Sequence, residues 1–317
     1  MAIAHNIAVN RVLLASPRGF CAGVDRAIEI VRLTLDVYGP PVYVFHEIVH
    51  NPYVVNALRE KGAIFVNGLS EVPPGARTIY SAHGVSPQVR AQAQERGLQV
   101  IDATCPLVTK VHLEAVRFDQ DGYFNILVGH KGHDEVVGTM GEVPGSIVLV
   151  STVEEAEAVT VPDPLRVAVL TQTTLSVDDT KDIIETLQRR FPSLIFPQKE
   201  DICYATQNRQ AAVRELAAQV DLVLVLGASN SSNSQRLREV AEQSGVASHL
   251  INDIEALQPA WLEGVKTVGI TSGASTPEFL VQQAIEYFQK SGAAEVRLLD
   301  TVKERVHFTL PRELRAV

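Results

Sequence analysis

The sequence predicts an α/β protein made of three similar α/β units, each with a small parallel sheet. Short runs of valine, isoleucine and leucine recur without polar alternation, which is typical of strands buried on both faces. Helix start signals follow several of these runs, and strands that alternate with helices imply parallel pairing. The order of the loops after the strands repeats three times, so we expect three copies of one arrangement.

Each copy contains three loops that follow apolar or mixed segments. The first loop carries a cysteine, the second is polar or rich in histidine, and the third contains serine, threonine or histidine and opens a helix. These segments with their loops occupy residues 13–21, 42–51 and 78–84, then 100–105, 125–130 and 167–174, then 201–203, 222–227 and 268–275. We therefore expect units at residues 10–105, 106–201 and 202–290, followed by a C-terminal tail at 291–317.

Local signals place helices after these loops. Ser86 and Thr276 each stand just before a proline, a pattern in which the hydroxyl caps the helix that follows. In the helix after Thr276 we expect Phe279 on the buried face and Gln282 on the exposed face. Ligands of parallel α/β proteins gather beyond the carboxyl ends of the strands, so the loops named above should form the functional site.

Composition narrows the class of partner. The 317-residue chain has 28 Lys and Arg against 37 Asp and Glu, which gives a net charge of −9. With no basic run, it is expected to bind neither nucleic acid nor a membrane. No stretch approaches the roughly 18 apolar residues of a membrane span, and the start of the chain is too weakly apolar for a signal peptide. These features favour a cytoplasmic protein.

Cys21, Cys105 and Cys203 are the only cysteines, and their odd number and wide separation do not suggest a disulfide framework. A single cysteine is often just a small buried residue, but each of these recurs at the same place in its unit. At a turn into a helix, a cysteine is stabilised as the thiolate. If the units pack around a pseudo-threefold axis, three thiolates meet at its centre. They could bind zinc or an iron–sulfur cluster with one metal position open, and the spacing does not choose between them.

Polar side chains in the other loops form a candidate anion site. Four of the nine histidines lie there, namely His50, His83, His130 and His133. A polar run also follows the apolar segment at 222–226, where it either caps a helix or cradles an anion with hydroxyls, amides and backbone N–H groups. The run is Asn230-Ser231-Ser232-Asn233-Ser234, and Ser275 and Thr276 offer similar donors in the last loop.

Glu135 stands two residues after His133 at a predicted helix start. It is either a first-turn acid favoured by the helix dipole or a buried general acid with a raised pKa. Thr173 is either a helix cap or a group that passes a proton between Glu135 and a substrate hydroxyl.

Taken in order, these motifs resemble the LytB-type family of hydroxymethylbutenyl diphosphate reductases, over about residues 10–310. The matching motifs are GFCAGV at 19–24, EIVHN at 47–51, SAHG at 81–84, DATCP at 102–106, GHKGH at 129–133, GTMG at 138–141, TQTT at 171–174 and NSSN at 230–233. Each motif alone is modest, but the ordered set is highly specific.

The resemblance implies a trefoil of three α/β units around one 4Fe–4S cluster per chain, held by Cys21, Cys105 and Cys203. It implies conversion of 4-hydroxy-3-methylbut-2-enyl diphosphate to isopentenyl and dimethylallyl diphosphate with loss of water. Glu135 is the implied proton source, and Thr173 relays the proton to the substrate hydroxyl. The residues implied to hold the diphosphate are His50, His83, Ser231, Ser232, Asn233 and Ser275. His133 is implied to lie near the diphosphate and to belong to both the substrate-binding and the catalytic residues.

The resemblance also implies a small electron donor such as a ferredoxin or flavodoxin. Two departures concern the field around the phosphates: Ser229 stands where many relatives have a lysine, and Lys131 lies at a position where relatives often differ. Three rival functions stay open at this stage. They are another three-cysteine iron–sulfur enzyme, like those of diphthamide synthesis, a zinc hydrolase, and a redox sensor that only holds a cluster.

Overall fold

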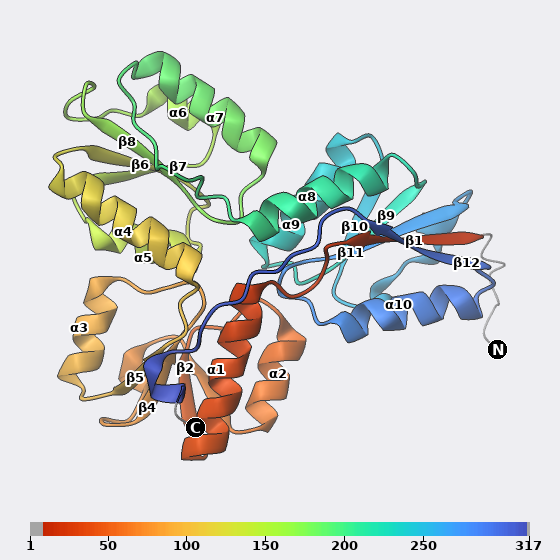
Figure 1. Cartoon of the computed structure of the whole chain (residues 1–317), viewed down its shortest axis with the longest axis horizontal. Helices are drawn as coiled ribbons and strands as arrows, with labels where there is room; N and C mark the ends of the chain where they lie inside the picture. Colours follow the sequence, from red (N-terminus) through yellow and green to blue (C-terminus); the bar gives the residue numbers. More distant parts are fainter. Residues whose placement is uncertain (1–8, 316–317) are drawn as a thin grey trace. The chain divides into compact units, whose positions relative to one another are not determined.

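The computed structural model describes residues 9–315 and contains three parallel sheets (Figure 1). The chain folds into two compact parts. The five-stranded part comprises residues 9–21, 50–53 and 204–306, and the two-sheet part comprises residues 22–49, 54–203 and 307–315. Three small parallel sheets with helices between their strands confirm the α/β class predicted from the sequence. Across residues 9–315, no helix has the length and apolar character needed to cross a membrane.

The five-stranded part has one sheet in the order β10-β9-β11-β1-β12, with every pair parallel. Its strands are β1 (Arg11–Ser16), β9 (Leu222–Leu226), β10 (Ala247–Ile251), β11 (Thr267–Ser272) and β12 (Glu295–Asp300). Its helices are α8 (Tyr204–Ala217), α9 (Ser232–Gln243) and α10 (Glu278–Lys290), with 3-10 turns η2 (Ile254–Ala256) and η3 (Pro259–Leu262). In Figure 1, α8 and α9 lie on one side of this sheet and α10 lies on the other.

Both faces of this sheet are buried, as the apolar runs predict. Leu224 of β9 packs in one cluster with Phe288 of α10, whereas its neighbour Val223 packs with Val213 of α8. Because adjacent residues of a strand point to opposite faces, an unbroken apolar strand needs a helix layer on each side. Each such buried side chain contributes about 1.5–3 kcal/mol to folding.

The two-sheet part has one sheet in the order β3-β2-β4-β5 and another in the order β7-β6-β8, all parallel. The first sheet and its connections are α1 (Ala22–Tyr38), β2 (Val42–Phe45), α2 (Pro52–Glu60), β3 (Ala63–Val66), η1 (Leu69–Glu71), β4 (Arg77–Tyr80), α3 (Pro87–Glu95) and β5 (Gln99–Asp102). The second comprises α4 (Pro106–Gln120), β6 (Phe124–Val128), α5 (Asp134–Glu142), β7 (Ile147–Val150), α6 (Val153–Ala158), β8 (Val167–Thr171) and α7 (Val177–Arg190). A last 3-10 turn, η4, spans Arg312–Leu314.

Strand pairing departs from the expected division of the chain in two places. β1 pairs with β11, with Leu13 opposite Gly269, and not with the other strands of residues 10–105. β12 lies in the expected tail and pairs with the other side of β1. The physical reason is that β1 is apolar on both faces and is buried best inside a sheet that has helices on both sides. Residues 316–317 of the expected tail lie outside the described residues.

The predicted cap of α3 is present, because the Ser86 hydroxyl oxygen accepts a hydrogen bond from the Val89 N–H. The predicted cap at Thr276 is wrong. Its buried hydroxyl donates instead to the Leu226 carbonyl at the end of β9, and α10 begins only at Glu278. The sequence pattern identified a hydroxyl before a proline but not the neighbouring strand end that competes for that hydroxyl.

Phe279 is also not on the buried face of α10 as predicted. Its side chain is 48% exposed and contacts the Tyr53 ring edge-on. The phase of the helix turns Leu280 and Val281 toward the sheet instead, whereas Gln282 is exposed as expected. Tyr53 therefore covers part of the Phe279 side chain, which lies outside the hydrophobic core.

Most of the predicted loops follow the ends of strands, among them β2, β4, β5, β6, β8, β9 and β11. The cysteine loop of the last repeat is the exception, since residues 196–203 form no strand. Cys203 is therefore placed by contacts of its loop and not by a preceding strand.

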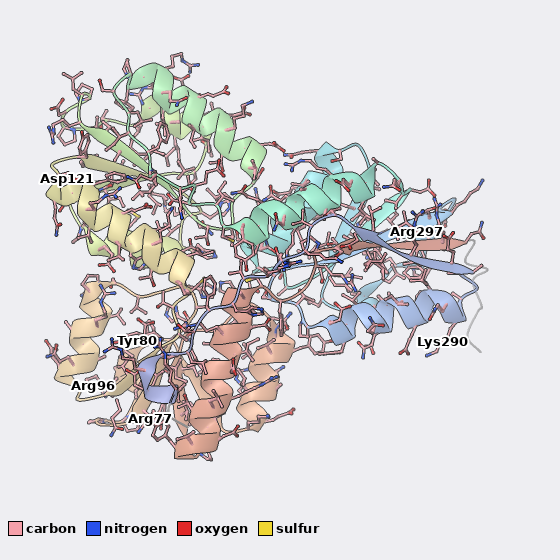
Figure 2. All side chains as sticks on the ribbon, in the orientation of Figure 1. Arg77, Tyr80, Arg96, Asp121, Lys290 and Arg297 are labelled. Carbon is pink, nitrogen blue, oxygen red and sulfur yellow. The ribbon has the colours of Figure 1, made fainter. Side chains whose placement is uncertain are left out.

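The edge of the five-stranded sheet carries exposed charge. β12 is an edge strand, and Figure 2 shows Arg297 on it and Lys290 at the end of α10. Exposed charged side chains along an edge strand oppose pairing with a strand of another chain.

Gly273 gives a direct test of the packing after β11. A Cβ at this position would lie 2.0 Å from the Oγ of Ser234, which is fully buried in α9. We expect Gly273→Ala to lower the free energy of unfolding by about 1–3 kcal/mol, because the buried serine cannot move aside. Adding Ser234→Ala should restore much of the loss, since it removes the clashing hydroxyl. Anaerobic urea denaturation of the single and double variants measures both effects; an unchanged midpoint in Gly273→Ala would contradict the packing.

Candidate functional site

The three cysteines occupy the same position relative to a helix. Cys21 immediately precedes α1, Cys105 is the N-cap of α4, and Cys203 immediately precedes α8. None of the three forms a disulfide, and all are half-buried. The turns into a helix predicted at Cys21 and Cys105 are confirmed, and the structure adds the same arrangement at Cys203. A helix N-terminus favours the thiolate, which is the metal-binding form.

Each cysteine is also held by the same backbone hydrogen bond. Its N–H donates to the carbonyl of the second residue after the end of a strand, which is β4, β8 or β11. The three bonds join Cys105 to Ala82 (2.9 Å), Cys203 to Thr173 (3.0 Å) and Cys21 to Ala274 (3.2 Å). The first and third loops of the repeats are therefore bonded to one another, a relation that the sequence pattern does not reveal.

In the five-stranded part, Asn233 supports the loop that binds Cys21. The Ala274 N–H donates to Asn233 Oδ1 at 2.8 Å, while the Ala274 carbonyl accepts the Cys21 N–H. Asn233 also donates weakly to the hydroxyl of Thr206 on α8, at 3.5 Å. The amide of Asn233 is buried, so it fixes the loop before any ligand binds.

The other predicted anion ligands of this part lie around the same loop. Ser231 caps α9, because its Oγ accepts the Ser234 N–H at 3.3 Å, and Ser232 is the first residue of the helix. The Ser275 hydroxyl donates to the backbone carbonyl of His50 at 3.0 Å. The helix start and the His50 loop therefore offer hydroxyls, an amide and an imidazole in one part of the molecule.

In the two-sheet part, Glu135 and Thr173 form a closed pair. The Thr173 N–H donates to Glu135 Oε1 at 2.7 Å, and the Thr173 hydroxyl donates to Oε2 at 2.9 Å. Only 3% of Glu135 and 5% of Thr173 are exposed. The carbonyl of the same threonine accepts the Cys203 N–H, so one residue contacts both the carboxylate and a cysteine loop.

Two of the predicted histidines lie beside this pair. His133 caps α5, and its Nδ1 accepts the Glu135 N–H at 3.2 Å. The His83 ring meets the His133 ring edge-on, with centroids 5.7 Å apart. The structure thus brings together four predicted residues of the two-sheet part, at the ends of β4 and β8 and the start of α5.

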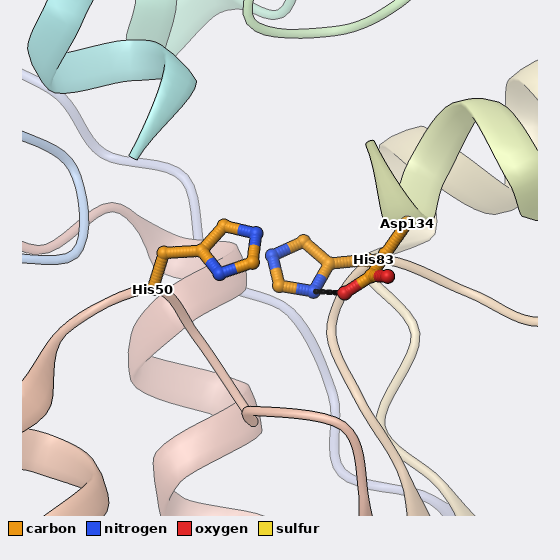
Figure 3. Close-up of side chains that lie close together, drawn as sticks. All are labelled: His50, His83 and Asp134. Carbon is orange, nitrogen blue, oxygen red and sulfur yellow. Dashed lines mark ion pairs between the residues drawn. The ribbon is translucent and has the colours of Figure 1, made fainter. Parts of the chain in front are cut away.

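Sequence reasoning missed Asp134 and His46. Asp134 lies within 2.8 Å of His46 Nδ1 and 3.9 Å of His83 Nδ1, and Figure 3 shows the pair of His83 and Asp134. His46 has a φ of 61°, an uncommon conformation for a residue other than glycine. The hydrogen bond with Asp134 raises the pKa of His46 above its usual 6.5. The available signal was an aspartate placed between His133 and Glu135.

The predicted site residues divide between the two parts. The five-stranded part contains Cys21, His50, Ser231, Ser232, Asn233 and Ser275, and the two-sheet part contains Cys105, Cys203, His83, His133, Glu135 and Thr173. Within each part they gather at the carboxyl ends of parallel strands or at helix starts, where the fold class predicts ligand binding.

The fold and these loops define a class: α/β proteins with three parallel sheets and a cysteine at the start of one helix in each repeat. Comparison with known proteins agrees, since a family model described as LytB protein matches residues 12–289. The chain therefore belongs to the LytB family, as its motifs predicted.

Relatives over nearly the whole length share one printed name, 4-hydroxy-3-methylbut-2-enyl diphosphate reductase. The Bordetella pertussis protein is 56% identical over 303 residues, which cover 96% of this chain and 93% of the relative. A Bradyrhizobium diazoefficiens protein, numbered 2 in its name, is 57% identical over 305 residues and covers 96% and 99%. The solved structure of the Plasmodium falciparum E-1-hydroxy-2-methyl-but-2-enyl-4-diphosphate reductase matches with a TM-score of 0.94 at 39% identity, covering 96% of this chain and 97% of the other.

The pairing of Asp134 with His46 predicts a pH effect. Asp134→Asn should lower the pKa of His46, because the bond to the carboxylate is the main cause of its raised value. The pair stabilises the folded wild type fully below pH 6.5 and loses that contribution as the pH rises through the raised pKa. The stability difference between wild type and variant should therefore be larger at about pH 6 than at about pH 9.

Imidazole NMR signals and urea midpoints at the two pH values measure these effects. His249, whose pKa is lowered by burial, serves as an internal reference and should not change. A variant in which His46 titrates as in wild type would show that the pair does not control this group.

Proposed function

We propose that this chain reduces 4-hydroxy-3-methylbut-2-enyl diphosphate to isopentenyl and dimethylallyl diphosphate, with loss of the hydroxyl group as water. The printed names of its relatives support the reaction. The observation on which the proposal most depends is the buried pair of Glu135 and Thr173, because loss of a hydroxyl as water needs a proton delivered to a poor leaving group.

We assign one 4Fe–4S cluster per chain to Cys21, Cys105 and Cys203. The donor set fits this group, because the three cysteines form no disulfide, are half-buried and stand at helix starts that favour thiolates. Their backbone N–H groups donate to loop carbonyls, which fixes the backbone from which each sulfur projects. When bound, the cluster would supply electrons and one iron without a cysteine ligand.

The contacts of Glu135 and Thr173 support distinct roles for the two residues in moving the proton. Both carboxylate oxygens face the threonine, one toward its N–H and one toward its hydroxyl. A hydroxyl can accept one proton while it donates another. Thr173 therefore takes the proton of a protonated Glu135 and passes its own to the substrate oxygen, and its N–H keeps the carboxyl group oriented.

Local donors must hold the diphosphate, because the net charge of the chain is −9. We assign this role to Ser231, Ser232 and Asn233 at the start of α9, where backbone N–H groups and the helix dipole favour an anion. The further donors assigned to the diphosphate are Ser275, His50, His83 and His133. The electron donor that we propose is a small protein such as a ferredoxin or flavodoxin.

Glu135→Gln tests the function through its proton source. The variant should keep the visible absorption of the cluster but lose turnover by about 10²–10⁴-fold, because an amide cannot supply the proton. Anaerobic assays with a low-potential reductant, followed by detection of the two diphosphate products, measure this. The matched control is Glu154→Gln, which alters an exposed first-turn glutamate of α6. Near-normal turnover of Glu135→Gln would remove the proposed proton source, and a wild type that forms neither product would remove the function.

A further inference from the structure

Each helix that follows a cysteine carries a cation in its second turn. Arg26 lies on α1, Lys110 on α4 and Arg209 on α8. Arg209 is the most unusual of the three, because its side chain is fully buried on the apolar stripe of its helix, at 0% exposure. Buried cations are rare unless paired and hydrogen-bonded, so each needs a structural reason.

All three cations donate to backbone carbonyls of a loop that leads into a different cysteine. Arg26 Nη1 donates to the carbonyls of Ala103 and Thr104, at 3.3 and 3.0 Å, directly before Cys105. Its Nε donates to the Thr309 carbonyl at 2.8 Å. These bonds engage carbonyls that no helix or strand can satisfy.

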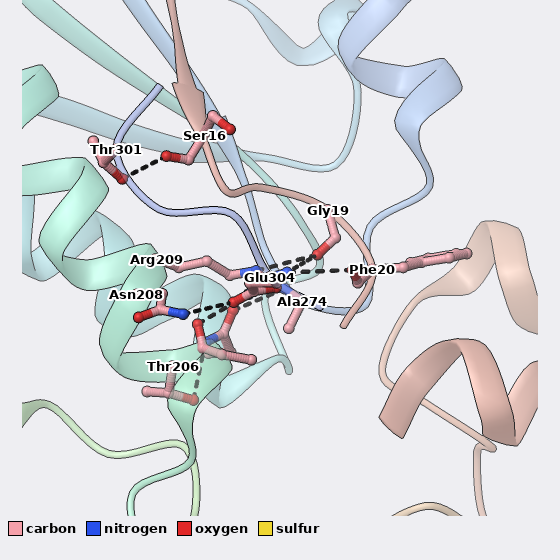
Figure 4. A network of polar contacts seen from close by, with 11 residues as sticks. Ser16, Gly19, Phe20, Thr206, Asn208, Arg209, Ala274, Thr301 and Glu304 are labelled. Atoms are coloured by element: carbon pink, nitrogen blue, oxygen red, sulfur yellow. Dashed lines mark hydrogen bonds and ion pairs between the residues drawn. The ribbon is translucent and has the colours of Figure 1, made fainter. Parts of the chain in front are cut away.

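Arg209 makes the corresponding contacts before Cys21. It donates to the Gly19 carbonyl from Nε and Nη2, at 3.2 and 2.8 Å, and to the Phe20 carbonyl at 3.2 Å. Figure 4 shows this guanidinium directed at both carbonyls and at the carboxylate of Glu304, whose Oε1 lies 3.0 Å from Nη1.

Lys110 completes the set before Cys203. Its ammonium group donates to the carbonyls of Lys199 and Glu200, at 2.6 and 3.2 Å. It also donates to Asp201 Oδ1 at 2.7 Å. Because residues 196–203 form no strand, these bonds supply the support that β1 and β5 give to the other two cysteine loops.

The contacts follow a closed order. The helix after Cys21 holds the loop before Cys105, the helix after Cys105 holds the loop before Cys203, and the helix after Cys203 holds the loop before Cys21. No contact in this set joins a helix to the cysteine at its own start. A cyclic order of this kind is what a threefold repeat produces when each copy supports the next.

Arg209 and Arg26 each bind the C=O of a peptide group whose N–H donates to a loop carbonyl. The Phe20 carbonyl and the Cys21 N–H belong to the same planar peptide, and they are bound by Arg209 and by the Ala274 carbonyl respectively. The peptide before Cys105 is held in the same way by Arg26 and the Ala82 carbonyl. A peptide plane held at its C=O and its N–H has little freedom to rotate, so the following Cα–Cβ direction is set.

We propose that Arg26, Lys110 and Arg209 are positioning residues, each of which fixes the sulfur of the next cysteine in the cycle for cluster binding. The inference rests on the proposed function for its metal, but the loop contacts stand without it. Two of the cations also face a carboxylate, Asp201 for Lys110 and Glu304 for Arg209. These carboxylates offset the positive charges of Lys110 and Arg209, so both cations can stay against the loop carbonyls in a partly or fully buried position.

The test replaces each cation and identifies the cysteine that becomes reactive. The variants are Arg26→Met, Lys110→Met and Arg209→Met, and the controls Arg32→Met and Arg117→Met change exposed arginines on α1 and α4. The anaerobically purified proteins are treated with an iron chelator and an alkylating reagent, and mass spectrometry follows each cysteine peptide. We expect alkylation on the order of tenfold faster at one cysteine in each variant, because loss of a residue that supports a metal ligand weakens metal binding by about 10–100-fold.

The proposal is tested by which cysteine is alkylated faster in each variant. Arg26→Met should expose Cys105, Lys110→Met should expose Cys203, and Arg209→Met should expose Cys21, whereas the controls should match wild type. Equal acceleration at all three cysteines, or acceleration at the cysteine of the same helix, would overturn it. If Arg209→Met does not fold, Arg209→Lys keeps the charge but loses the fork of donors, so a smaller increase confined to Cys21 is expected, and no increase there would overturn the proposal.

Iron and sulfide analysis of the wild type tests the proposed cluster separately from the positioning role of the cations. Wild-type protein without iron would refute the proposed cluster, yet the alkylation pattern would still show whether each cation supports the next cysteine. Wild-type protein with a cluster, but with no cysteine-specific pattern in the variants, would refute only the positioning role.

Discussion

The constraint on which the rest of the structure depends is the hydrogen bond from each cysteine N–H to a loop beyond the end of a parallel strand. Cys21, Cys105 and Cys203 would otherwise lie in flexible turns, and a ligand that must first be ordered binds metal more weakly. The parallel sheets supply rigid strand ends, and the helices supply N-termini that favour thiolates. Thus loops beyond strand ends fix the backbone of all three cysteines at the start of a helix.

Thr173 connects this scaffold to the chemistry. Its carbonyl holds the Cys203 loop, while its N–H and hydroxyl hold the buried carboxylate of Glu135. Asn233 has a similar place in the five-stranded part, because it supports the loop of Cys21 at the start of a helix assigned to the diphosphate. Thr173 and Asn233, which hold cysteine loops, are therefore also next to the groups that we assign to the proton relay and to the diphosphate.

Much of this could be predicted from the sequence, because local patterns report local physics. The buried run of β9 and the cap at Ser86 depend on near neighbours and were predicted correctly. The sheet that receives β1 depends on pairing with strands more than two hundred residues away, and the Thr276 hydroxyl is taken by a strand end far along the chain. Arg209 could have been noticed as a cation on an apolar helix stripe, but its carbonyl partners appear only in the folded chain.

We propose that the three repeated cysteine loops hold one cluster with a single iron free of cysteine. Mössbauer spectroscopy of protein grown on ⁵⁷Fe, recorded with and without the diphosphate substrate, tests it most directly. We expect a 4Fe–4S cluster in which one iron in about four differs from the rest and changes alone when substrate is added. Four equivalent irons that ignore the substrate, or a protein that binds zinc and no iron, would contradict it.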